Sequence, residues 1–269
     1  MTQSAFDALA PTYDDDYSNT LIGQYLRQRV QTRLMLHFSA GDSVLEMGCG
    51  TGEDAYFLGE QGIHILATDV SEKMLAITDE KTVTLNTVTT AHLDLNNLSD
   101  DFSSGKDDEK FDGAFANAGV LNCVSDYGRL AKWLAARLRP GAVFAAGVMS
   151  PFCIWELLWH GLHLDFSVAT RRWRKSTFQP DDTVAPIVID YPTINHLKQA
   201  LSPFFTPAKV MPLGLFLPPS DVFAVIEKRS RLLKRLTTLE NQFQNWQGLS
   251  HFADHYWIEF ERTTHPICQ

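Results

Sequence analysis

Val44-Leu-Glu-Met-Gly-Cys-Gly-Thr-Gly52 is the stretch that decides the fold of this 269-residue chain. Residues 43–47 have the apolar pattern of a short buried strand, and residues 53–60 that of a helix, so the glycines lie in a strand-to-helix turn. Glycine permits a tight turn and a close approach of ligand to main chain, and the helix start offers free N–H groups. The stretch predicts a ligand-binding turn of an α/β fold; a glycine-rich turn without a ligand is the alternative.

The spacing of the glycines argues against a dinucleotide ligand. Dinucleotide sites use G-x-G-x-x-G, and here the position of the third glycine holds Glu53. Glu53 and Asp54 place two carboxylates in the first helical turn, and Glu46 adds a third before the first glycine. These charges would repel a pyrophosphate. A ligand with positive charge therefore suits the turn better than an anionic one.

Short apolar strands alternate with helices on both sides of this turn, which predicts an α/β fold with a doubly wound, mostly parallel sheet. We expect seven strands with helices on both faces, an N-terminal helical cap and a lid insertion after the fifth strand. The expected strands are 43–47, 63–69, 83–93, 111–116, 142–148, 205–216 and 255–262. The expected helices are 4–38, 53–60, 72–81, 127–138, 193–201 and 229–246, and 176–191 is expected to form a hairpin.

Four segments follow from this pattern. They are an N-terminal helical cap (1–40), a ligand-binding α/β core (41–150), a lid or substrate insertion (151–192), and a C-terminal part (193–269) that completes the sheet and carries a helical insertion. Ligands of such sheets bind at the carboxyl ends of the strands. The aromatic content of 151–175 leads us to expect that cap and lid close over that edge and hold a small molecule.

Glu46-x-Gly48-x-Gly50-x-Gly52 resembles the first motif of class I (Rossmann-like) S-adenosylmethionine-dependent methyltransferases of the small-molecule type. In that family the acidic residue helps to hold the amino-acid end of the cofactor, and the glycine segment, here including Cys49, passes beneath it. S-adenosylmethionine carries a sulfonium and an ammonium, so it also meets the charge argument. The resemblance extends from residue 6 to about residue 149 and fades beyond.

The resemblance implies further cofactor contacts. Asp69 would accept hydrogen bonds from the ribose hydroxyls, Val70 and Met74 would flank the adenine, and Asp94 with Leu95 would meet its amino group and ring. Asn117, Ala118 and Gly119 would lie beside the methionine moiety, and Tyr13 would cover the cofactor. Simpler alternatives remain: Met74 and Tyr13 as core residues, Asp94 as a loop residue, and Ser71 as a helix N-cap. Asn117-Ala118-Gly119 departs from the (N/D)-P-P-(Y/F) sequence of enzymes that methylate adenine or amide nitrogen, which argues against those substrates.

The composition limits the kinds of partner that we expect the chain to bind. The net charge is -9, so the chain lacks the overall basic footprint of a nucleic-acid binder. No apolar run approaches the roughly 20 residues that span a bilayer, and the first residues do not resemble a signal peptide. We therefore expect a cytoplasmic protein with no membrane partner; the oligomeric state is left open. Cys49, Cys123, Cys153 and Cys268 are scattered, and free thiols are the simple interpretation.

Other clusters are given less weight. His160, His163 and Asp165 show too few ligands for zinc, as do His251 and His255, so no metal is predicted. The basic run 171–175 is interpreted as a solvated helix face, with an anion site as the alternative. No catalytic residue is assigned; His160, His163 and Tyr191 are the positions to inspect.

The sequence thus predicts a methyltransferase that moves a methyl group in line from S-adenosylmethionine to an O, N or C atom of an unidentified small molecule, leaving S-adenosylhomocysteine. The cofactor would carry the chemistry, and the protein would orient the acceptor and exclude water. The rivals are an RNA methyltransferase, a catalytically silent protein that binds the same cofactor, and a nicotinamide-dependent dehydrogenase.

Overall fold

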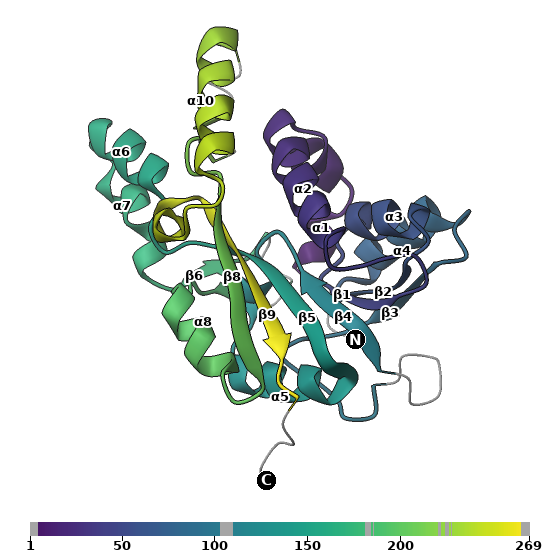
Figure 1. The fold of residues 1–269 in the computed structure, drawn as a ribbon. Helices are drawn as coiled ribbons and strands as arrows, with labels where there is room; N and C mark the ends of the chain where they lie inside the picture. The colour runs from purple at the N-terminus through teal and green to yellow at the C-terminus, as the bar shows by residue number, and fades with distance from the viewer. Residues whose placement is uncertain are drawn as a thin grey trace.

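A seven-stranded sheet in the order β3-β2-β1-β4-β5-β9-β8 forms the centre of the molecule (Figure 1). The computed structural model describes residues 5–102, 110–180, 184, 186–219, 222–223, 226 and 228–264. The strands are β1 (Ser43–Met47), β2 (His64–Asp69), β3 (Val88–His92), β4 (Phe111–Ala116), β5 (Leu138–Met149), β8 (Phe205–Leu213) and β9 (His255–Arg262). The first five pair in parallel, and β9 runs antiparallel to both β5 and β8. The predicted fold class is confirmed.

Helices cover both faces of the sheet because the strands are apolar on both sides. Along β1, Val44 packs with one core cluster and Leu45 with the other. On the Val44 face lie α2 (Leu21–Leu34), α3 (Glu53–Glu60) and α4 (Glu72–Thr82). On the Leu45 face lie α5 (Tyr127–Arg137) and α8 (Ile194–Leu201). The alternation along one strand therefore assigns each helix layer to a face.

The sequence predicted one long helix over residues 4–38, and this prediction is wrong. The N-terminal segment consists of α1 (Phe6–Leu9), a short π-helical segment (Asp14–Ser18) and α2. Thr20 separates the last two, because its backbone is extended and its side-chain oxygen accepts a hydrogen bond from the Gly23 N–H at 3.1 Å. The breaks let the chain turn at residues 10–12 and again at Thr20 before α2 packs on the sheet.

Strand limits differ most from the prediction in the third and fifth strands. The third strand begins at Val88 rather than at residue 83, because α4 continues to Thr82 and a turn follows. The fifth strand begins at Leu138, directly after α5, and its register against β4 shifts between Phe111 and Gly113. Residues 103–109 and Cys268 lie outside the described residues.

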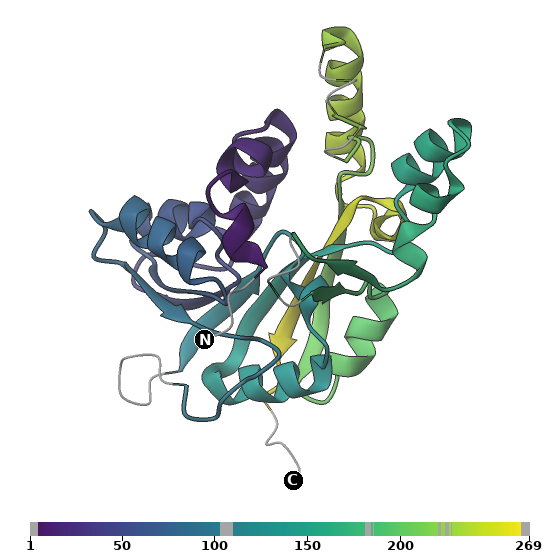
Figure 2. The ribbon, with the colours of Figure 1, turned by 180° about the vertical axis from the view of Figure 1, so that it is seen from behind.

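The segment after β5 is helical and then turns back as a hairpin. It contains α6 (Ile154–Leu162), α7 (Phe166–Ala169) and a 3-10 turn (Arg171–Trp173). The strands β6 (Ser176–Phe178) and β7 (Ile187–Ile189) pair antiparallel, as predicted, although residues 181–183 lie outside the described part. Figure 2 shows α2, α6 and α10 (Ser230–Phe243) projecting from the same side of the sheet, the side on which β5 ends. Of the helices that the structure describes, none has the length and apolar character to cross a bilayer.

Glu259 of β9 fixes α2 to the sheet through a buried ion pair. Its carboxylate accepts three hydrogen bonds from Arg33, at 2.6, 2.8 and 2.9 Å, and one from the Trp257 indole at 2.8 Å. The His37 Nε2 lies 3.1 Å from the same carboxylate. Burial raises the pKa of Glu259, but the hydrogen bonds from His37, Arg33 and Trp257 outweigh it and lower that pKa from 4.5 to about 2.

We predict that Glu259→Gln destabilises the protein by about 2 kcal/mol, because it leaves the half-buried Arg33 without its counter-charge. A carboxyl with a depressed pKa stabilises the fold above its unfolded pKa, and this contribution is lost as the pH falls toward 2. Urea titrations between pH 7 and 2 should therefore show a smaller acid-induced loss of unfolding free energy for the variant. Glu261→Gln, at an exposed site of the same strand, should behave like the wild type; equal pH curves for all three proteins would contradict the prediction.

Candidate functional site

The turn between β1 and α3 is built from three glycines in the left-handed conformation. Gly48, Gly50 and Gly52 have φ angles of 69°, 55° and 79°. A Cβ atom on Gly48 would lie 2.3 Å from the Val120 side chain, and one on Gly52 would lie 2.6 Å from that of Thr78. Only glycine meets both the conformational and the steric demand at these two positions. The main chain is therefore bare where it passes the carboxyl edge of the sheet.

Asp69, at the end of β2, holds this turn in place. One of its oxygens accepts a hydrogen bond from the Gly50 N–H and the other accepts one from the Ser71 N–H, both at 2.9 Å. Burial raises the pKa of Asp69 above its ordinary value, although these backbone donors counteract the shift. A carboxylate offers about four acceptor positions, so each oxygen can accept a further bond from a ligand. Asp69 thus shapes the turn and keeps acceptor capacity.

A cavity with about 300 Å³ of empty space, part of it open to solvent, lies against the turn. It is lined by an aromatic ring, the glycine turn and several charged or amide side chains: Tyr13, Arg27, Glu46, Gly48, Cys49, Gly50, Thr51, Asp54, Asn117 and Ala118. The cavity therefore joins the N-terminal segment to the ends of β1 and β4.

Two polar atoms in this cavity have no partner. Glu46 is 2% exposed, and its Oε2 is buried without a hydrogen bond. The Nε atom of Arg27 is also buried and has no hydrogen-bond partner. Burial, with the neighbouring Asp54 charge, raises the pKa of Glu46 well above 4.5, while Arg27 counteracts the shift. Buried polar atoms in native proteins are almost always paired, so unpaired ones need an explanation. A ligand with one ammonium and one carboxylate would satisfy both atoms.

Asp54 ties three elements together at the back of the cavity. It lies in the first turn of α3, and its two oxygens accept hydrogen bonds from Gln31 at 3.0 Å and from Asn117 at 2.8 Å. The Asn117 side-chain oxygen in turn accepts a bond from the Ala118 N–H at 2.8 Å. Asp54 therefore positions the end of β4 as well as contributing negative charge near Glu46.

The structure brings together half of the predicted site residues. Lining the cavity are Tyr13, Glu46, Gly48, Cys49, Gly50, Asn117 and Ala118. Outside its lining are Gly52, Asp69, Val70, Met74, Asp94, Leu95 and Gly119. Met74 is 2% exposed, and the Asp94 side chain accepts a bond from the Asn96 N–H at 2.8 Å. The roles toward a nucleoside that the sequence assigned to this second set stay predictions.

Sequence reasoning did not assign Arg27, Thr51 or Asp54 to the site. Asp54 was noted only as a charge in the first helical turn, although its place directly after the glycines was an available signal. Thr51 lies inside the glycine motif, and its hydroxyl donates to Asp14 at 2.5 Å. Arg27 reaches the cavity because α2 packs across α3, and no spacing in the sequence reports that packing.

The positions that the sequence analysis marked for inspection lie elsewhere. His163 has its Nδ1 2.7 Å from the Trp159 carbonyl oxygen, and Tyr191 lies beneath the Arg172 guanidinium at 5.7 Å. His160 likewise does not line the cavity. None of the three is therefore placed to act on a ligand bound there.

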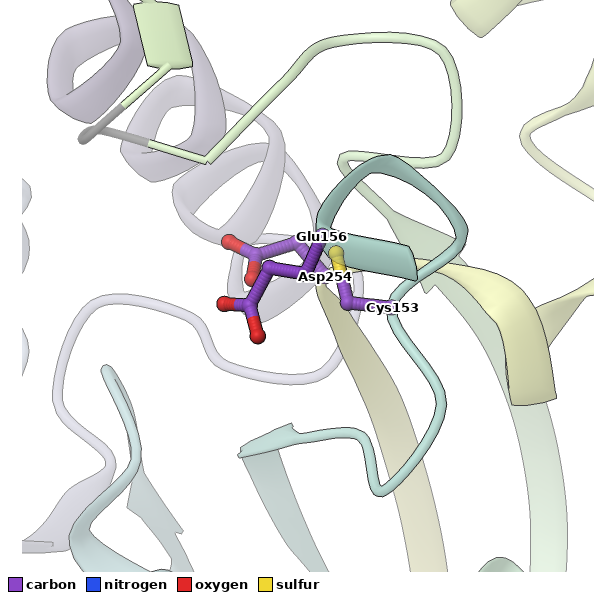
Figure 3. A group of neighbouring side chains, drawn as sticks. All are labelled: Cys153, Glu156 and Asp254. Atoms are coloured by element: carbon purple, nitrogen blue, oxygen red, sulfur yellow. The ribbon is translucent and has the colours of Figure 1, made fainter. Parts of the chain in front are cut away.

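The interpretation of residues 171–175 as a solvated helix face is wrong for Arg172. This side chain is 7% exposed and joins Glu156 at 2.6 Å and Asp254 at 2.5 Å. Figure 3 shows Glu156 and Asp254 beside Cys153, a grouping whose ligand atoms lie within 4.8 Å of one another. The guanidinium already supplies positive charge to both carboxylates, so the group is a buried ion network rather than an open cation site.

A methyltransferase domain family matches residues 45–144, which span β1 to the middle of β5. Residues 45–144 therefore form a methyltransferase domain. The predicted family is confirmed, and with it S-adenosylmethionine as the cofactor class of such domains. This methyltransferase domain contains the glycine turn, Glu46, Asp69 and Asn117, whereas Tyr13 and Arg27 come from the segment before it.

Relatives of this chain differ in how much of it they share. A demethylmenaquinone methyltransferase of Clavibacter sepedonicus is 29% identical over 136 residues, which are 51% of this chain and 53% of the relative. The chain spans about half the length of the curated relatives it matches. A solved S-adenosylmethionine-dependent methyltransferase of Mesorhizobium loti has a TM-score of 0.55 at 20% identity, covering 88% of this chain and 98% of its own. The [4+2]-cyclase SpnF has a TM-score of 0.53 at 16% identity, covering 87% and 80%. These two solved structures show that the chain shares their fold.

We predict that Gly48→Ala lowers the unfolding free energy by about 2–3 kcal/mol, because it adds left-handed strain to a contact with Val120 that has no room for a Cβ. Differential scanning calorimetry of the variant and the wild type measures the loss of unfolding free energy. Gly161→Ala is the control: its Cβ would meet nothing within 4 Å, and it lies within a helix, so it should be neutral or stabilising. Equal stability of the two variants would contradict the steric account.

Proposed function

We propose that this chain transfers a methyl group from S-adenosylmethionine to a small-molecule acceptor. The observation that carries the proposal is the pair of unpaired buried atoms, Glu46 Oε2 and Arg27 Nε, in one cavity beneath the glycine turn. The amino-acid end of the cofactor has an ammonium for the first and a carboxylate for the second. Charge-assisted hydrogen bonds of this kind are the stronger ones.

The bound cofactor would supply a methyl carbon that its sulfonium has already activated. The chain's own residues would then bind and orient the cofactor. Gly48, Gly50 and Gly52 let the main chain approach the ligand, and Asp69 offers acceptor positions to the ribose hydroxyls. The ring of Tyr13, whose nearest carbon lies 3.8 Å from a Cβ built on Gly50, lies over the turn. Its face also suits a sulfonium.

A demethylated quinone is the first acceptor class to assay. This follows only from the name of the curated relatives, demethylmenaquinone methyltransferase, of which the chain spans about half. We further propose that the cap (1–40) and the lid insertion (151–192) contribute the acceptor contacts. The cap already supplies Tyr13 and Arg27 to the cavity, and the lid segment follows β5 on the same side of the sheet.

Two other functions are less favoured. An RNA methyltransferase would need a basic groove, and the chain carries a net charge of -9. A chemistry other than methyl transfer on this fold has a specific example, since a protein named as a [4+2]-cyclase, SpnF, shares the fold. Fold alone does not decide between these chemistries, so the acceptor assay below is needed in addition to binding.

We predict that the two ends of the cofactor can be separated by calorimetry. Glu46→Gln and Arg27→Met should each weaken S-adenosylhomocysteine about 10- to 100-fold, since each removes one charge-assisted bond worth about 1.5–3 kcal/mol. The same variants should leave methylthioadenosine, which lacks the amino-acid end, at wild-type affinity. Asp69→Asn should weaken both ligands.

The control variant for this test is Glu53→Gln, a carboxylate of the same first helical turn that pairs with Lys81 and does not line the cavity. It should bind both ligands like the wild type. Tighter binding of NAD than of S-adenosylhomocysteine, or an equal loss of both adenosine ligands in Glu46→Gln, would contradict the assignment.

We also predict that the wild-type chain transfers label from methyl-labelled S-adenosylmethionine to an acceptor in a panel of demethylated quinones and cell-extract metabolites. Mass spectrometry of the products identifies the acceptor. Glu46→Gln should retain less than about a tenth of this transfer at limiting cofactor, because its binding defect is of that size. Cofactor binding with no labelled product in the whole panel would favour the silent alternative.

A further inference from the structure

Two aspartates of the N-terminal cap, Asp7 and Asp14, bind the α/β core on either side of Tyr13 in the chain. Asp7 lies in α1 and is buried. Its Oδ1 accepts a hydrogen bond from the Ser71 hydroxyl at 2.5 Å. Ser71 caps the start of α4, and its N–H donates to Asp69, the residue that holds the glycine turn. The first helix of the cap is therefore attached next to Asp69.

Asp14 joins the π-helical segment to the glycine turn itself. Its Oδ1 accepts a hydrogen bond from the Thr51 hydroxyl at 2.5 Å, and its Oδ2 accepts one from the Lys81 ammonium at 3.0 Å. Thr51 is a buried residue of the turn, and Lys81 belongs to the last turn of α4. Burial raises the pKa of Asp14, but three side-chain hydrogen bonds, the first from Thr51, outweigh it and lower that pKa below 3.8. The carboxylate is therefore ionised at neutral pH, and both contacts are charge-assisted.

Tyr13, which directly precedes Asp14, reaches the cavity from this segment. Its ring lines the cavity, with Cε1 3.8 Å from a Cβ built on Gly50. The ring of Tyr17 packs against it with centroids 5.1 Å apart, but Tyr17 is 46% exposed and gives it little support. The two hydrogen bonds of Asp14 fix the main chain one residue from Tyr13 on the turn that the ring faces. Asp14 is therefore placed to hold the ring where it lies.

We infer that Asp14 is a positioning residue that seats Tyr13 over the cofactor and thereby slows the release of the cofactor from the cavity. The inference rests on the proposed function, because the ligand that Tyr13 retains is S-adenosylmethionine or its product. Asp14 does not line the cavity, so it acts through Tyr13 and not by touching the ligand. Loss of the carboxylate should therefore speed dissociation of the ligand, and it should do so only while the Tyr13 ring is present.

The test is a double-mutant cycle on the dissociation rate of S-adenosylhomocysteine from the full chain, measured by surface plasmon resonance. Asp14→Ala should speed dissociation about five- to tenfold, because two charge-assisted bonds at a partly exposed site are lost. In a Tyr13→Ala background the same change should speed it less than about twofold, because no ring is left to position. Lys81→Met removes one of the two donors and should act in the same direction as Asp14→Ala but more weakly.

The matched control is Asp15→Ala, which removes the same charge from the next, exposed position of the π-helical segment. It should release the ligand at the wild-type rate, and circular dichroism checks that every variant is folded. Amide hydrogen exchange of the free chain is a second readout that needs no ligand: Asp14→Ala should speed exchange over residues 13–18, and Asp15→Ala should not.

Three results would overturn the inference and leave the proposed function standing. They are a wild-type dissociation rate in Asp14→Ala, equal accelerations with and without the Tyr13 ring, and unchanged hydrogen exchange in Asp14→Ala. A wild-type chain that does not bind S-adenosylhomocysteine contradicts the proposed function instead. The exchange readout then decides by itself whether Asp14 holds the segment that carries Tyr13.

Discussion

The left-handed turn of Gly48, Gly50 and Gly52, held by the Asp69 carboxylate, is the constraint on which the site depends. Side chains longer than hydrogen do not fit at Gly48 and Gly52. Because the turn is fixed, α3 begins directly behind it and brings Asp54 beneath the end of β4. The same turn leaves Glu46, one residue inside β1 from its end, facing the cavity instead of the core.

The charges around this turn differ from those elsewhere in the molecule. Glu259, Glu240 and Asp254 are buried, and each meets an arginine: Arg33, Arg29 and Arg172. Among the carboxylates that the structure describes, Glu46 is the one with a buried oxygen that no donor reaches. The fold therefore neutralises these three acids with arginines and leaves one oxygen of Glu46 without a donor where the cavity opens. Such a departure from internal pairing is expected at a functional site.

Most of the fold could be predicted because strand and helix periods are local properties of the sequence. Residues 53–60 and 255–262 were predicted with the limits that the structure has, and the mostly parallel sheet follows from the alternation of strands and helices. The helix limits of the N-terminal cap were harder to predict, because the break at Thr20 depends on one hydrogen bond to its side chain. Arg27 and Arg172 could not be placed from spacing, because each meets its surroundings across a long sequence separation: Arg27 in the cavity with Glu46, and Arg172 in the pair with Asp254. Local signals thus located the turn, while tertiary packing completed the cavity.

A crystal structure of the chain grown with S-adenosylhomocysteine tests the central claim most directly. The account predicts that the ligand's ammonium lies within hydrogen-bond distance of Glu46, its carboxylate at Arg27, and its ribose hydroxyls at Asp69. A crevice filled instead by a phosphate-bearing nucleotide, or a ligand whose amino-acid end avoids Glu46, would contradict it.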